Sequence, residues 1–256
     1  MDYNLGIVLS GGGVRALAHI GLLQALNENN IHPEIVAGTS GGAMVGALYA
    51  AGYDTQSMLQ FFKETPLFKF SLYTLNKPGI MDTEKYSVFF KSYFKENSFE
   101  SLKKPLYVTA TNLMTGKLTF FNSGELIRPI LASAALPPIF SPINIDDNLY
   151  SDGGILNNFP VEPLHVSCKN ILGSFVNPLS PIQKNDIKST MDLVQRVYHI
   201  GLDAKDLVKF NQCNYVFSPP NIYKIGIFDN KSVIKAYEFG YKHALAEMPR
   251  ILETIQ

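Results

Sequence analysis

The sequence has 256 residues, of which 46% are hydrophobic and 17% are charged, so a folded globular protein with a sizeable core is expected. Lysine plus arginine and aspartate plus glutamate each number 22, and the formal charges cancel. A neutral chain without a basic block argues against nucleic acid as the main partner. The two cysteines, Cys168 and Cys213, fit neither a disulfide framework nor a metal ligand set, which predicts a reducing compartment.

Neither a targeting signal nor a membrane span is indicated by the hydropathy pattern. The N-terminus, Met1 to Asn4, lacks the charged region and long apolar core of a signal peptide. The longest nearly apolar stretch, 43–53, is too short for a bilayer span, which takes about 18 or more residues. We therefore expect a cytoplasmic protein that is soluble or peripheral on a membrane surface. Nothing has the composition of a linker, so one domain over residues 1–256 is expected.

Short strand and helix patterns alternate along the chain. Residues 5–9 predict a buried strand that enters a glycine-rich loop, and 14–27 has helical spacing. Residues 35–37 predict a second strand, and 43–51 a helix of small residues. Two strand–helix units in succession indicate a parallel sheet with helices on its faces. The later elements are expected in this order: a helix at 83–94, a hairpin of strands at 106–112 and 117–121, a helix at 126–133, a strand at 171–175, a helix at 190–210, a strand at 215–218 and a helix at 231–255.

The first stretch with a chemical signature is Gly38-Thr39-Ser40-Gly41-Gly42, at the turn from the second predicted strand into its helix. A serine between glycines at such a turn holds its hydroxyl exposed, and the following helix directs its N-terminal amides at a reacting carbonyl. The pattern alone is a weak signal, because G-x-S-x-G arises by chance in about one protein in ten of this length. Its strand–helix setting favours Ser40 as a nucleophile over an idle serine in a turn.

A second glycine-rich loop, Gly11-Gly12-Gly13, joins the first predicted strand to its helix. Consecutive glycines let backbone N–H groups form a concavity that suits an anion. In an acyl-transfer enzyme this concavity would be the oxyanion hole, where one donor commonly contributes about 3–4 kcal/mol to lowering the barrier. Arg15 follows the loop, where its charge would orient the loop or attract a phosphate or carboxylate. The alternative for Arg15 is a pair with a surface acid.

The same loop also fits a dinucleotide-binding fingerprint, because Gly11, Gly13 and Ala16 match G-x-G-x-x-G/A. That fingerprint needs an acidic residue at the end of the second strand for the ribose hydroxyl. Here the second strand ends at Gly38, and the nearest acid, Glu34, precedes it. A dinucleotide-dependent enzyme is therefore kept only as a weaker alternative, and no cofactor is predicted.

A third segment, Asp152-Gly153-Gly154, follows a short strand-like stretch, and by itself Asp-Gly is an ordinary turn. The ordered set of three motifs, however, resembles the patatin-like phospholipase family. The resemblance runs from about residue 5 to about residue 165. Two further stretches add to it: residues 132–142, Ala-Ser-Ala-Ala-Leu-Pro-Pro-Ile-Phe-Ser-Pro, and residues 157–161, Asn-Asn-Phe-Pro-Val.

One departure from the family pattern stands in the first glycine-rich loop. The family often has glycine where this chain has Ala16. Alanine is the mildest replacement for glycine, and it would disturb the start of the helix if that position needed a positive φ.

The resemblance implies a three-layer α/β/α patatin-like fold with a mostly parallel central sheet, completed by C-terminal helices over about 190–255. It also implies a Ser-Asp dyad in place of a triad. Ser40 would attack an acyl ester of a lipid, and Asp152 would activate the serine and then water. Backbone amides of Gly11–Gly13 and Gly41 would hold the oxyanion. The implied activity is of the phospholipase A or lysophospholipase type, and the substrate stays open among a phospholipid, a lysophospholipid, a neutral glyceride and a thioester. No cluster of Asp, Glu or His has metal-ligand spacing, so no metal is expected. An aspartate base would need burial to raise its pKa above about 3.9.

Histidines decide between this dyad and an α/β-hydrolase triad, which needs a histidine after the acid. His165, His199 and His243 follow Asp152, whereas His19 and His32 precede it. None lies in a recognisable motif, and the nucleophile elbow of that class follows several strands, not the second. A triad esterase and a catalytically idle regulatory homologue remain as alternatives.

Residues 61–73 are unusually aromatic, with interspersed lysines. One interpretation is a cap over Ser40 that accepts an acyl chain or touches a membrane surface. The other interpretation, which the pattern slightly favours, is ordinary core packing of a helix and the loop that follows it.

Overall fold

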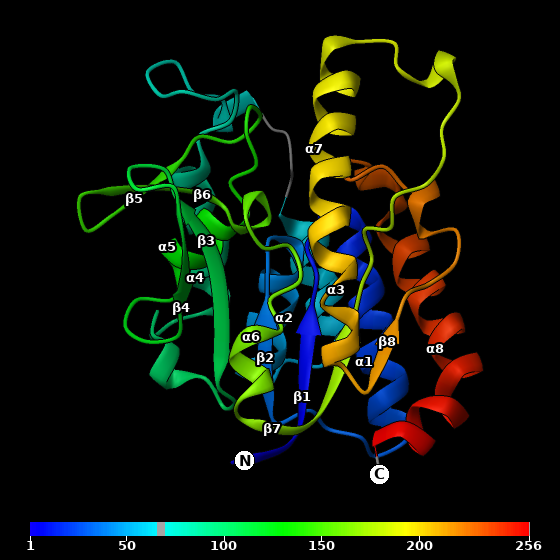
Figure 1. The fold of residues 1–256 in the computed structure, drawn as a ribbon. Helices are drawn as coiled ribbons and strands as arrows, with labels where there is room; N and C mark the ends of the chain where they lie inside the picture. The colour runs from blue at the N-terminus through cyan, green and yellow to red at the C-terminus, as the bar shows by residue number, and fades with distance from the viewer. Residues whose placement is uncertain (66–69, 256) are drawn as a thin grey trace.

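The computed structural model describes residues 1–65 and 70–255, and an eight-stranded sheet forms its centre (Figure 1). The strand order is β5-β6-β3-β2-β1-β7-β8, and β4 pairs with β3 outside this path. Five strands run parallel to one another: β1 (Tyr3–Leu9), β2 (Ile35–Gly38), β3 (Leu106–Asn112), β7 (Cys168–Ser174) and β8 (Tyr215–Phe217). Three are antiparallel to their neighbours at one side: β4 (Lys117–Phe121), β5 (Ile143–Ile145) and β6 (Asn148–Asp152). The expected mostly parallel sheet is confirmed.

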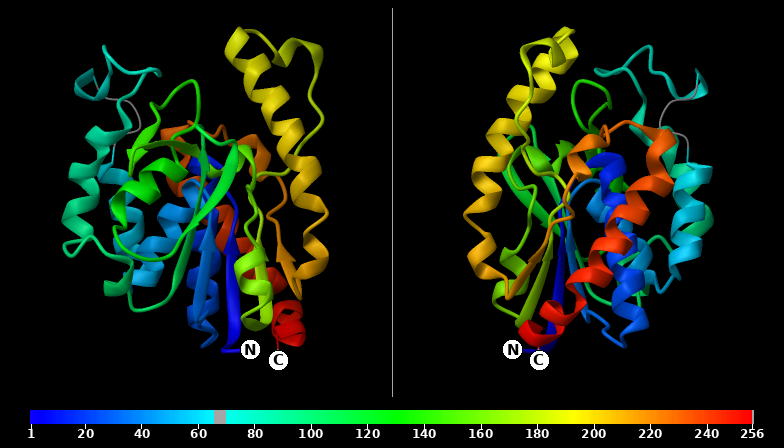
Figure 2. Two further views of the ribbon diagram at one scale, coloured as in Figure 1. Left: turned by 60° about the vertical axis from the view of Figure 1, so that its left-hand side comes forward. Right: turned by 90° about the vertical axis from the view of Figure 1, so that its right-hand side faces the viewer.

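Helices cover both faces of this sheet (Figure 2). One face carries α1 (Leu17–Glu28), α2 (Gly41–Ala51), α3 (Thr55–Glu64) and α8 (Val233–Ile255), and the other carries α6 (Glu162–His165) and α7 (Thr190–Leu207). The central strand β1 serves both layers because side chains alternate along a strand. Leu5, Ile7 and Leu9 join the larger core on the α1 side, whereas Val8 joins the core on the α6 side.

The N-terminal helix α1 and the C-terminal helix α8 touch backbone to backbone. A Cβ on Gly21 of α1 would lie 2.4 Å from the Tyr237 carbonyl oxygen, and one on Gly240 of α8 would lie 2.1 Å from the Ala18 carbonyl oxygen. Glycine at both positions therefore allows the close crossing. The last helix of the chain is packed against the first.

The predicted elements occur in the predicted order, with differences at their ends. The helices predicted at 14–27 and 83–94 each begin with a 3₁₀ turn, Gly13–Ala16 and Thr83–Tyr86, before α1 and α4 (Ser87–Tyr93). The predicted hairpin is β3 and β4, and the helix predicted at 126–133 is α5 (Ile127–Ser133). The short strand β5 and the one-turn helix α6 had no sequence signal of their own.

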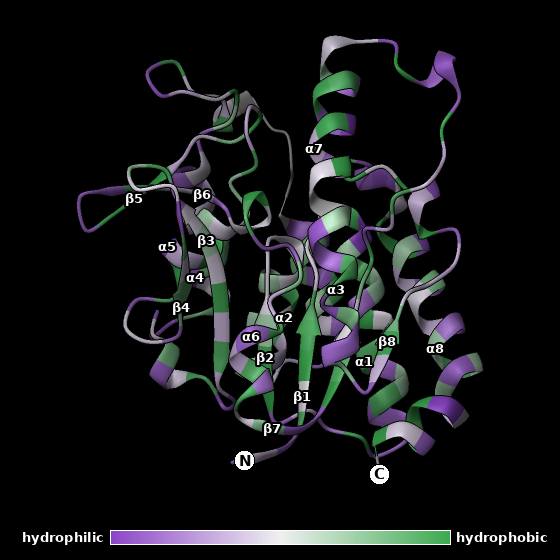
Figure 3. Ribbon diagram, in the orientation of Figure 1, coloured by the Kyte–Doolittle hydropathy of each residue, from purple (hydrophilic) through white to green (hydrophobic). Residues whose placement is uncertain are grey.

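The carboxyl ends of β1, β2 and β7 meet at one end of the sheet, and the glycine-rich loops follow there (Figure 1). Helix α7 and the segment before it project beyond this end. Figure 3 shows hydrophobic turns along α7 beside hydrophilic ones. Within 1–65 and 70–255, no helix combines the length and the apolar character needed to cross a bilayer.

Candidate active site

Ser40 occupies the sharp turn between β2 and α2. Its backbone has φ 53° and ψ −124°, a conformation that non-glycine residues rarely adopt. The Ser40 amide donates a hydrogen bond of 2.8 Å to Ser133 Oγ, which helps to hold the strained residue. A Cβ on Gly42 would lie 2.3 Å from the Leu9 carbonyl oxygen, so the turn can approach β1 this closely only with glycine there. The half-buried hydroxyl of Ser40 is thus presented at the end of the sheet.

Asp152 reaches Ser40 from the last residue of β6, 112 residues further along the chain. Its Oδ2 accepts a hydrogen bond of 2.8 Å from Ser40 Oγ. Its Oδ1 accepts one of 2.7 Å from the Gly154 amide, which caps the 3₁₀ turn Gly153–Ile155. Thr111 Oγ1 donates to the Asp152 carbonyl at 2.9 Å and fixes the backbone on the neighbouring strand β3. The two residues that the sequence singled out are therefore in direct contact.

The Asp152 carboxyl is almost completely removed from water, with 3% of the residue exposed. Burial raises the pKa of Asp152 to about 7, while the hydrogen bonds from the Gly154 amide and the Ser40 hydroxyl act in the opposite direction. A carboxylate is an efficient general base when its pKa lies near the working pH. Burial thus converts an ordinarily weak base into one suited to neutral solution.

The first glycine-rich loop lies beside Ser40, and its amides differ in what they bind. The Gly11 amide donates to the Asn158 carbonyl at 3.1 Å. By contrast, the amides of Gly12 and Gly13 have no acceptor within the described part of the chain. Gly13 has φ 56°, and a Cβ there would lie 2.1 Å from the Ile227 carbonyl oxygen. Of the three amides in this loop that the sequence predicted as oxyanion donors, only those of Gly12 and Gly13 are therefore available.

Ala16 does not disturb this loop. Its φ of −60° lies in the right-handed helical region, where alanine is favourable. The departure from the family pattern has no conformational cost, because the positive φ of the loop falls on Gly13 instead.

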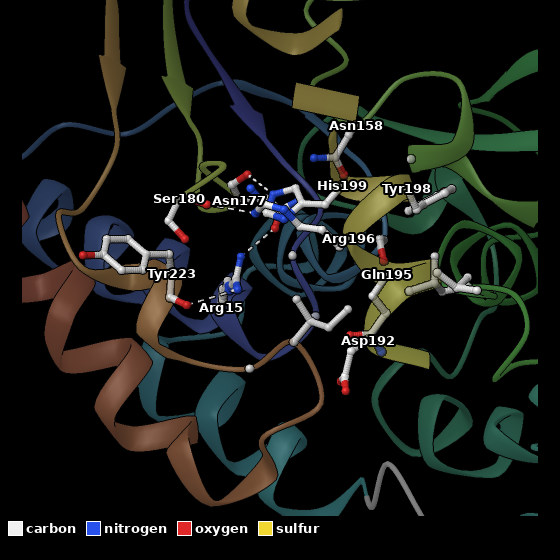
Figure 4. Close-up of a pocket in the computed structure, with 18 of the residues that line it drawn as sticks. Arg15, Asn158, Asn177, Ser180, Asp192, Gln195, Arg196, Tyr198, His199 and Tyr223 are labelled. Atoms are coloured by element: carbon white, nitrogen blue, oxygen red, sulfur yellow. Dashed lines mark hydrogen bonds between the residues drawn. The ribbon is translucent and has the colours of Figure 1, made fainter. Parts of the chain in front are cut away.

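Arg15 is buried and hydrogen-bonded to neutral acceptors (Figure 4). Its Nε donates to the Ile225 carbonyl at 2.7 Å, Nη1 donates to Asn177 Oδ1 at 2.8 Å, and Nη2 to the Tyr223 carbonyl at 3.3 Å. Burial lowers the pKa of Arg15 to about 10, so the guanidinium is charged at neutral pH. The expected alternative, a pair with a surface acid, is wrong, because these three acceptors carry no charge.

Two unlike cavities meet at Ser40. The larger, of about 300 Å³, is lined by polar side chains that include Arg15, Asp152 and Asn177, together with the inner face of α7. The smaller, of about 100 Å³, has a mostly apolar wall. That wall includes Met44, Phe61, Phe62, Phe90, Leu131 and Phe140. Gly13, Ser40, Leu136 and Ile227 line both cavities, so the hydroxyl stands where an apolar and a polar space join.

Helix α7 forms the wall of the polar cavity that faces Ser40. Figure 4 shows Asp192, Gln195, Arg196, Tyr198 and His199 along this wall. The Tyr198 hydroxyl is buried and has no hydrogen-bond partner in the described residues. Burial raises the pKa of Tyr198, and the nearby negative charge of Asp152 raises it further. The tyrosine therefore remains a neutral donor at the edge of the site.

No histidine takes the place of Asp152 beside Ser40, since the Ser40 hydroxyl donates to the aspartate. His199 is the one of the three downstream candidates that lines the polar cavity, and its Nε2 lies 2.8 Å from the Asn177 carbonyl. His165 is exposed at the end of α6, and the ring of His243 packs against that of Phe217.

His19 is a buried core residue. Its ring nitrogens bond Ser174 Oγ at 2.7 Å and the Ser10 carbonyl at 2.9 Å, and burial lowers its pKa to about 4. A neutral imidazole at this place ties the first strand to β7 directly behind the glycine-rich loop.

The aromatic segment 61–73 is described only in part, since 66–69 lie outside the described residues. Phe61 is fully buried, packs edge-to-face on Phe90 with ring centroids 5.0 Å apart, and lines the apolar cavity with Phe62. The expected core packing therefore holds for Phe61. The alternative interpretation, a cap over Ser40 that accepts an acyl chain or touches a membrane surface, stays a prediction.

The position of Glu34 argues against the dinucleotide-binding alternative. The Glu34 amide donates to the Leu5 carbonyl at the start of β2, so Glu34 lies at the opposite end of the parallel strands from the glycine-rich loop. It is too far along the sheet to meet a ribose held at that loop.

A family model described as patatin-like phospholipase matches residues 7–165, more than half of the chain. The chain belongs to the patatin-like phospholipase family. The resemblance drawn from its ordered motifs is confirmed.

Two relatives are informative. An uncharacterized NTE family protein of Mycobacterium tuberculosis is 32% identical over 162 residues, which are 62% of this chain and 45% of that protein. A protein of Aspergillus fumigatus named lysophospholipase nte1 is 31% identical over 225 residues, which are 85% of this chain and 14% of its own length. The chain thus spans less than half the length of these relatives.

Among solved structures, the crystal structure of VipD from Legionella pneumophila superposes with a TM-score of 0.57 at 14% identity. The match covers 96% of this chain and 66% of VipD. At this identity the likeness concerns the fold, and it supports the α/β architecture described above.

Several residues of the site had no assigned role in the sequence. Two of them fall in stretches that carried the family resemblance. Ser133 accepts a hydrogen bond from the Ser40 amide, and the Asn158 carbonyl accepts one from the Gly11 amide. The α7 wall had no motif at all. Its polar residues recur at helical spacing, but that spacing also describes an ordinary solvated face, so no signal could have assigned them to the site.

Proposed function

We propose that this chain hydrolyses acyl esters of lipids through a Ser40–Asp152 dyad. The observation that carries the proposal is the hydrogen bond of 2.8 Å from Ser40 Oγ to Asp152 Oδ2, formed where the apolar and polar cavities join. A positioned base within hydrogen-bond reach is what a serine nucleophile requires. Membership of the patatin-like phospholipase family supports the same chemistry.

The reaction would proceed in two halves. In the first, Ser40 Oγ attacks the ester carbonyl carbon while its proton moves to Asp152 Oδ2, and the protonated carboxyl then gives that proton to the leaving alkoxide. The carbonyl oxygen becomes negative during the attack and would be met by the unengaged amides of Gly12 and Gly13. In the second half water attacks the acyl-serine carbonyl while Asp152 takes its proton. The bond from the acyl carbon to Ser40 Oγ then breaks, the protonated carboxyl returns the proton to Ser40 Oγ, and the fatty acid leaves.

The two cavities suggest how the substrate lies. The acyl chain would occupy the apolar cavity lined by Phe61, Phe62 and Phe90, where its burial is favourable. The polar leaving group would occupy the cavity that holds the charged Arg15 and Arg196. A glycerophosphate ester fits this division because its phosphate can meet a guanidinium group there, in a cavity that Asp186 and Asp192 also line. Since the Aspergillus fumigatus relative is named a lysophospholipase, we propose lysophospholipids as the first substrates to assay.

A fluorophosphonate probe tests the nucleophile directly. The wild-type chain should be labelled once, on the tryptic peptide that contains Ser40, and Ser40→Ala should remove both the label and the hydrolysis of lysophospholipids. Ser92→Ala, at an exposed serine of α4, is the matched control and should keep both. Labelling that persists in Ser40→Ala would refute the proposed nucleophile, and a correctly folded wild-type chain that neither reacts nor hydrolyses would indicate an idle homologue.

A further inference from the structure

Exposed apolar side chains gather in one part of the molecule. Among the described residues, eight of the twenty large hydrophobic side chains that are exposed lie between Ile182 and Val208. All residues from 181 to 190 are exposed, and α7 continues the same stretch. We call residues 181–200 the α7 arm. A monomeric soluble protein rarely shows such a concentration without a binding role.

The α7 arm has two different faces. Its inner face, with Arg196 and His199, lines the polar cavity. Its outer face carries Leu193, Val197 and Ile200, which are 49%, 60% and 48% exposed. Their i, i+4, i+7 spacing places them on one side of the helix. The helix therefore separates the proposed substrate cavity from an outward apolar row.

A second apolar projection stands at the same end of the molecule. The loop of residues 73–80 exposes Tyr73, Leu75 and Ile80, and Leu75 is 97% exposed. Figures 1 and 2 show this loop and the α7 arm projecting from the end of the sheet toward which β1 points. Two separate segments thus present apolar side chains on the side where the cavities lie.

We infer that the α7 arm and the 73–80 loop dock this chain on a lipid surface. Both project from the end that holds Ser40, and the family acts on lipid esters, whose molecules reside in such surfaces. A broad lipid surface can receive two separated apolar projections at once. Because no described helix can span a bilayer, the contact is interfacial. The inference rests on the family and on these surfaces, and not on the catalytic role of Ser40.

Apolar burial, and not charge, supplies the affinity of this contact. The α7 arm holds Lys184, Lys188 and Arg196 against Asp186 and Asp192, so its formal charge is only +1. We therefore expect binding to vesicles of the zwitterionic lipid phosphatidylcholine, with little change between low and high salt. An interaction driven by basic residues would instead weaken strongly as salt is added.

The test is a flotation assay of the full chain with phosphatidylcholine vesicles. Leu193→Gln combined with Val197→Gln should lower the partition coefficient at least about tenfold, because each side chain loses most of its apolar burial. Leu75→Gln alone should lower it severalfold. Ile234→Gln combined with Leu245→Gln is the matched control, since these α8 residues are 42% and 43% exposed on the opposite face of the sheet. The control should bind like the wild type.

Two further measurements separate docking from folding and from catalysis. Hydrolysis of the water-soluble ester p-nitrophenyl butyrate should stay within about twofold in every docking variant, because none of the substituted residues lines a cavity. Ser40→Ala should still float with vesicles. A chain that floats through the α7 arm but hydrolyses nothing would refute the proposed function and leave the docking intact.

Three results would overturn the docking inference. The wild-type chain could fail to bind vesicles, or the α7 double variant could bind as well as the α8 control. The third such result is that light scattering shows the wild type to be a dimer and the Leu193→Gln, Val197→Gln variant to be a monomer. The apolar row would then be an interface between copies of this chain.

Discussion

The two sides of the proposed site are built on different principles. On one side, the loops after β1, β2 and β6 hold Ser40, the glycine amides and Asp152, with hydrogen bonds to helix α5, to strand β3 and to a loop carbonyl. On the other side, α7 presents a row of polar side chains from a helix whose outer face is exposed. The strand-end loops are anchored to the core, whereas helix α7 leaves its outer face exposed.

This difference separates two tasks. Bond breaking needs atoms that are held in place within a few tenths of an ångström, and loops anchored at the ends of packed strands provide this precision. Recognition of a leaving group needs only complementary charge and shape, which a helix at the surface can supply. We therefore expect substitutions in the strand-end loops to abolish turnover of every ester. Substitutions on the α7 wall should instead change which ester is preferred.

The largest effect is expected from Asp152→Asn. The amide keeps the shape of the side chain but cannot accept the serine proton, so kcat/KM should fall at least about 100-fold for any ester, including p-nitrophenyl butyrate. Asp146→Asn is the control, because Asp146 is an exposed turn residue with φ 48° that asparagine tolerates. Full activity in Asp152→Asn would leave the dyad without a base.

The pH profile gives the next largest effect. Only the ionised carboxylate can accept a proton, so kcat/KM should fall about tenfold per pH unit below the pKa of Asp152, which is about 7. A histidine base would give a limb near about 6.5, too close to separate by position alone. The profile should therefore be repeated with His165, His199 and His243 all replaced by alanine. Loss of the limb or of activity in that folded variant would favour a triad.

A smaller and selective effect is expected on the α7 wall. Arg196→Gln removes a positive charge from the polar cavity, so hydrolysis of a lysophospholipid with an anionic headgroup should fall up to about tenfold. The rate with p-nitrophenyl butyrate should not change. Arg250→Gln, at an exposed arginine of α8, is the matched control. An equal loss with both esters would mean that α7 acts on the chemistry and would break the distinction between the two sides.

The smallest effect concerns the stability of the strand-end loops. Burial raises the pKa of Asp152 above its unfolded value of about 3.9, so the folded state holds a proton that the unfolded state has lost. The stability from this group is therefore complete below about pH 4 and declines as the pH rises through 7. Between pH 5.5 and 8 the loss amounts to about 1–2 kcal/mol.

Thermal denaturation can measure that loss by difference. The Asp152→Asn variant has no carboxyl group to titrate at this position. The Tm of the variant minus the Tm of the wild type should therefore be a few degrees larger at pH 8 than at pH 5.5. A difference in Tm that is constant with pH would show that Asp152 has an ordinary pKa in the folded chain.

The strand-end side of the site was largely predictable from the sequence. Its strands are short apolar runs, and its loops need glycine where the backbone passes close to a neighbouring strand, as at Gly42 against Leu9. Such requirements leave a pattern in consecutive residues. The pairing of Ser40 with Asp152 was not local, and it followed only from the order of the motifs and the family that they resemble.

The other side could not be predicted, because its contacts are tertiary. Arg15 bonds carbonyls of Ile225 and Tyr223, more than 200 residues away, and a carbonyl acceptor leaves no trace in the residue type. The helix at α7 was predicted, but which of its faces lines the cavity depends on where the helix packs. Amphipathic spacing alone gives the same pattern for either arrangement.

The glycine contact between α1 and α8 has a consequence for how the chain is made. Helix α1 is synthesised long before Gly240 of α8, which it needs as a packing partner. Strand β1 likewise waits for β7. The segment that holds the glycine-rich loop therefore cannot complete its packing until α8 has been synthesised, so this part of the chain depends on contacts between residues far apart in the sequence.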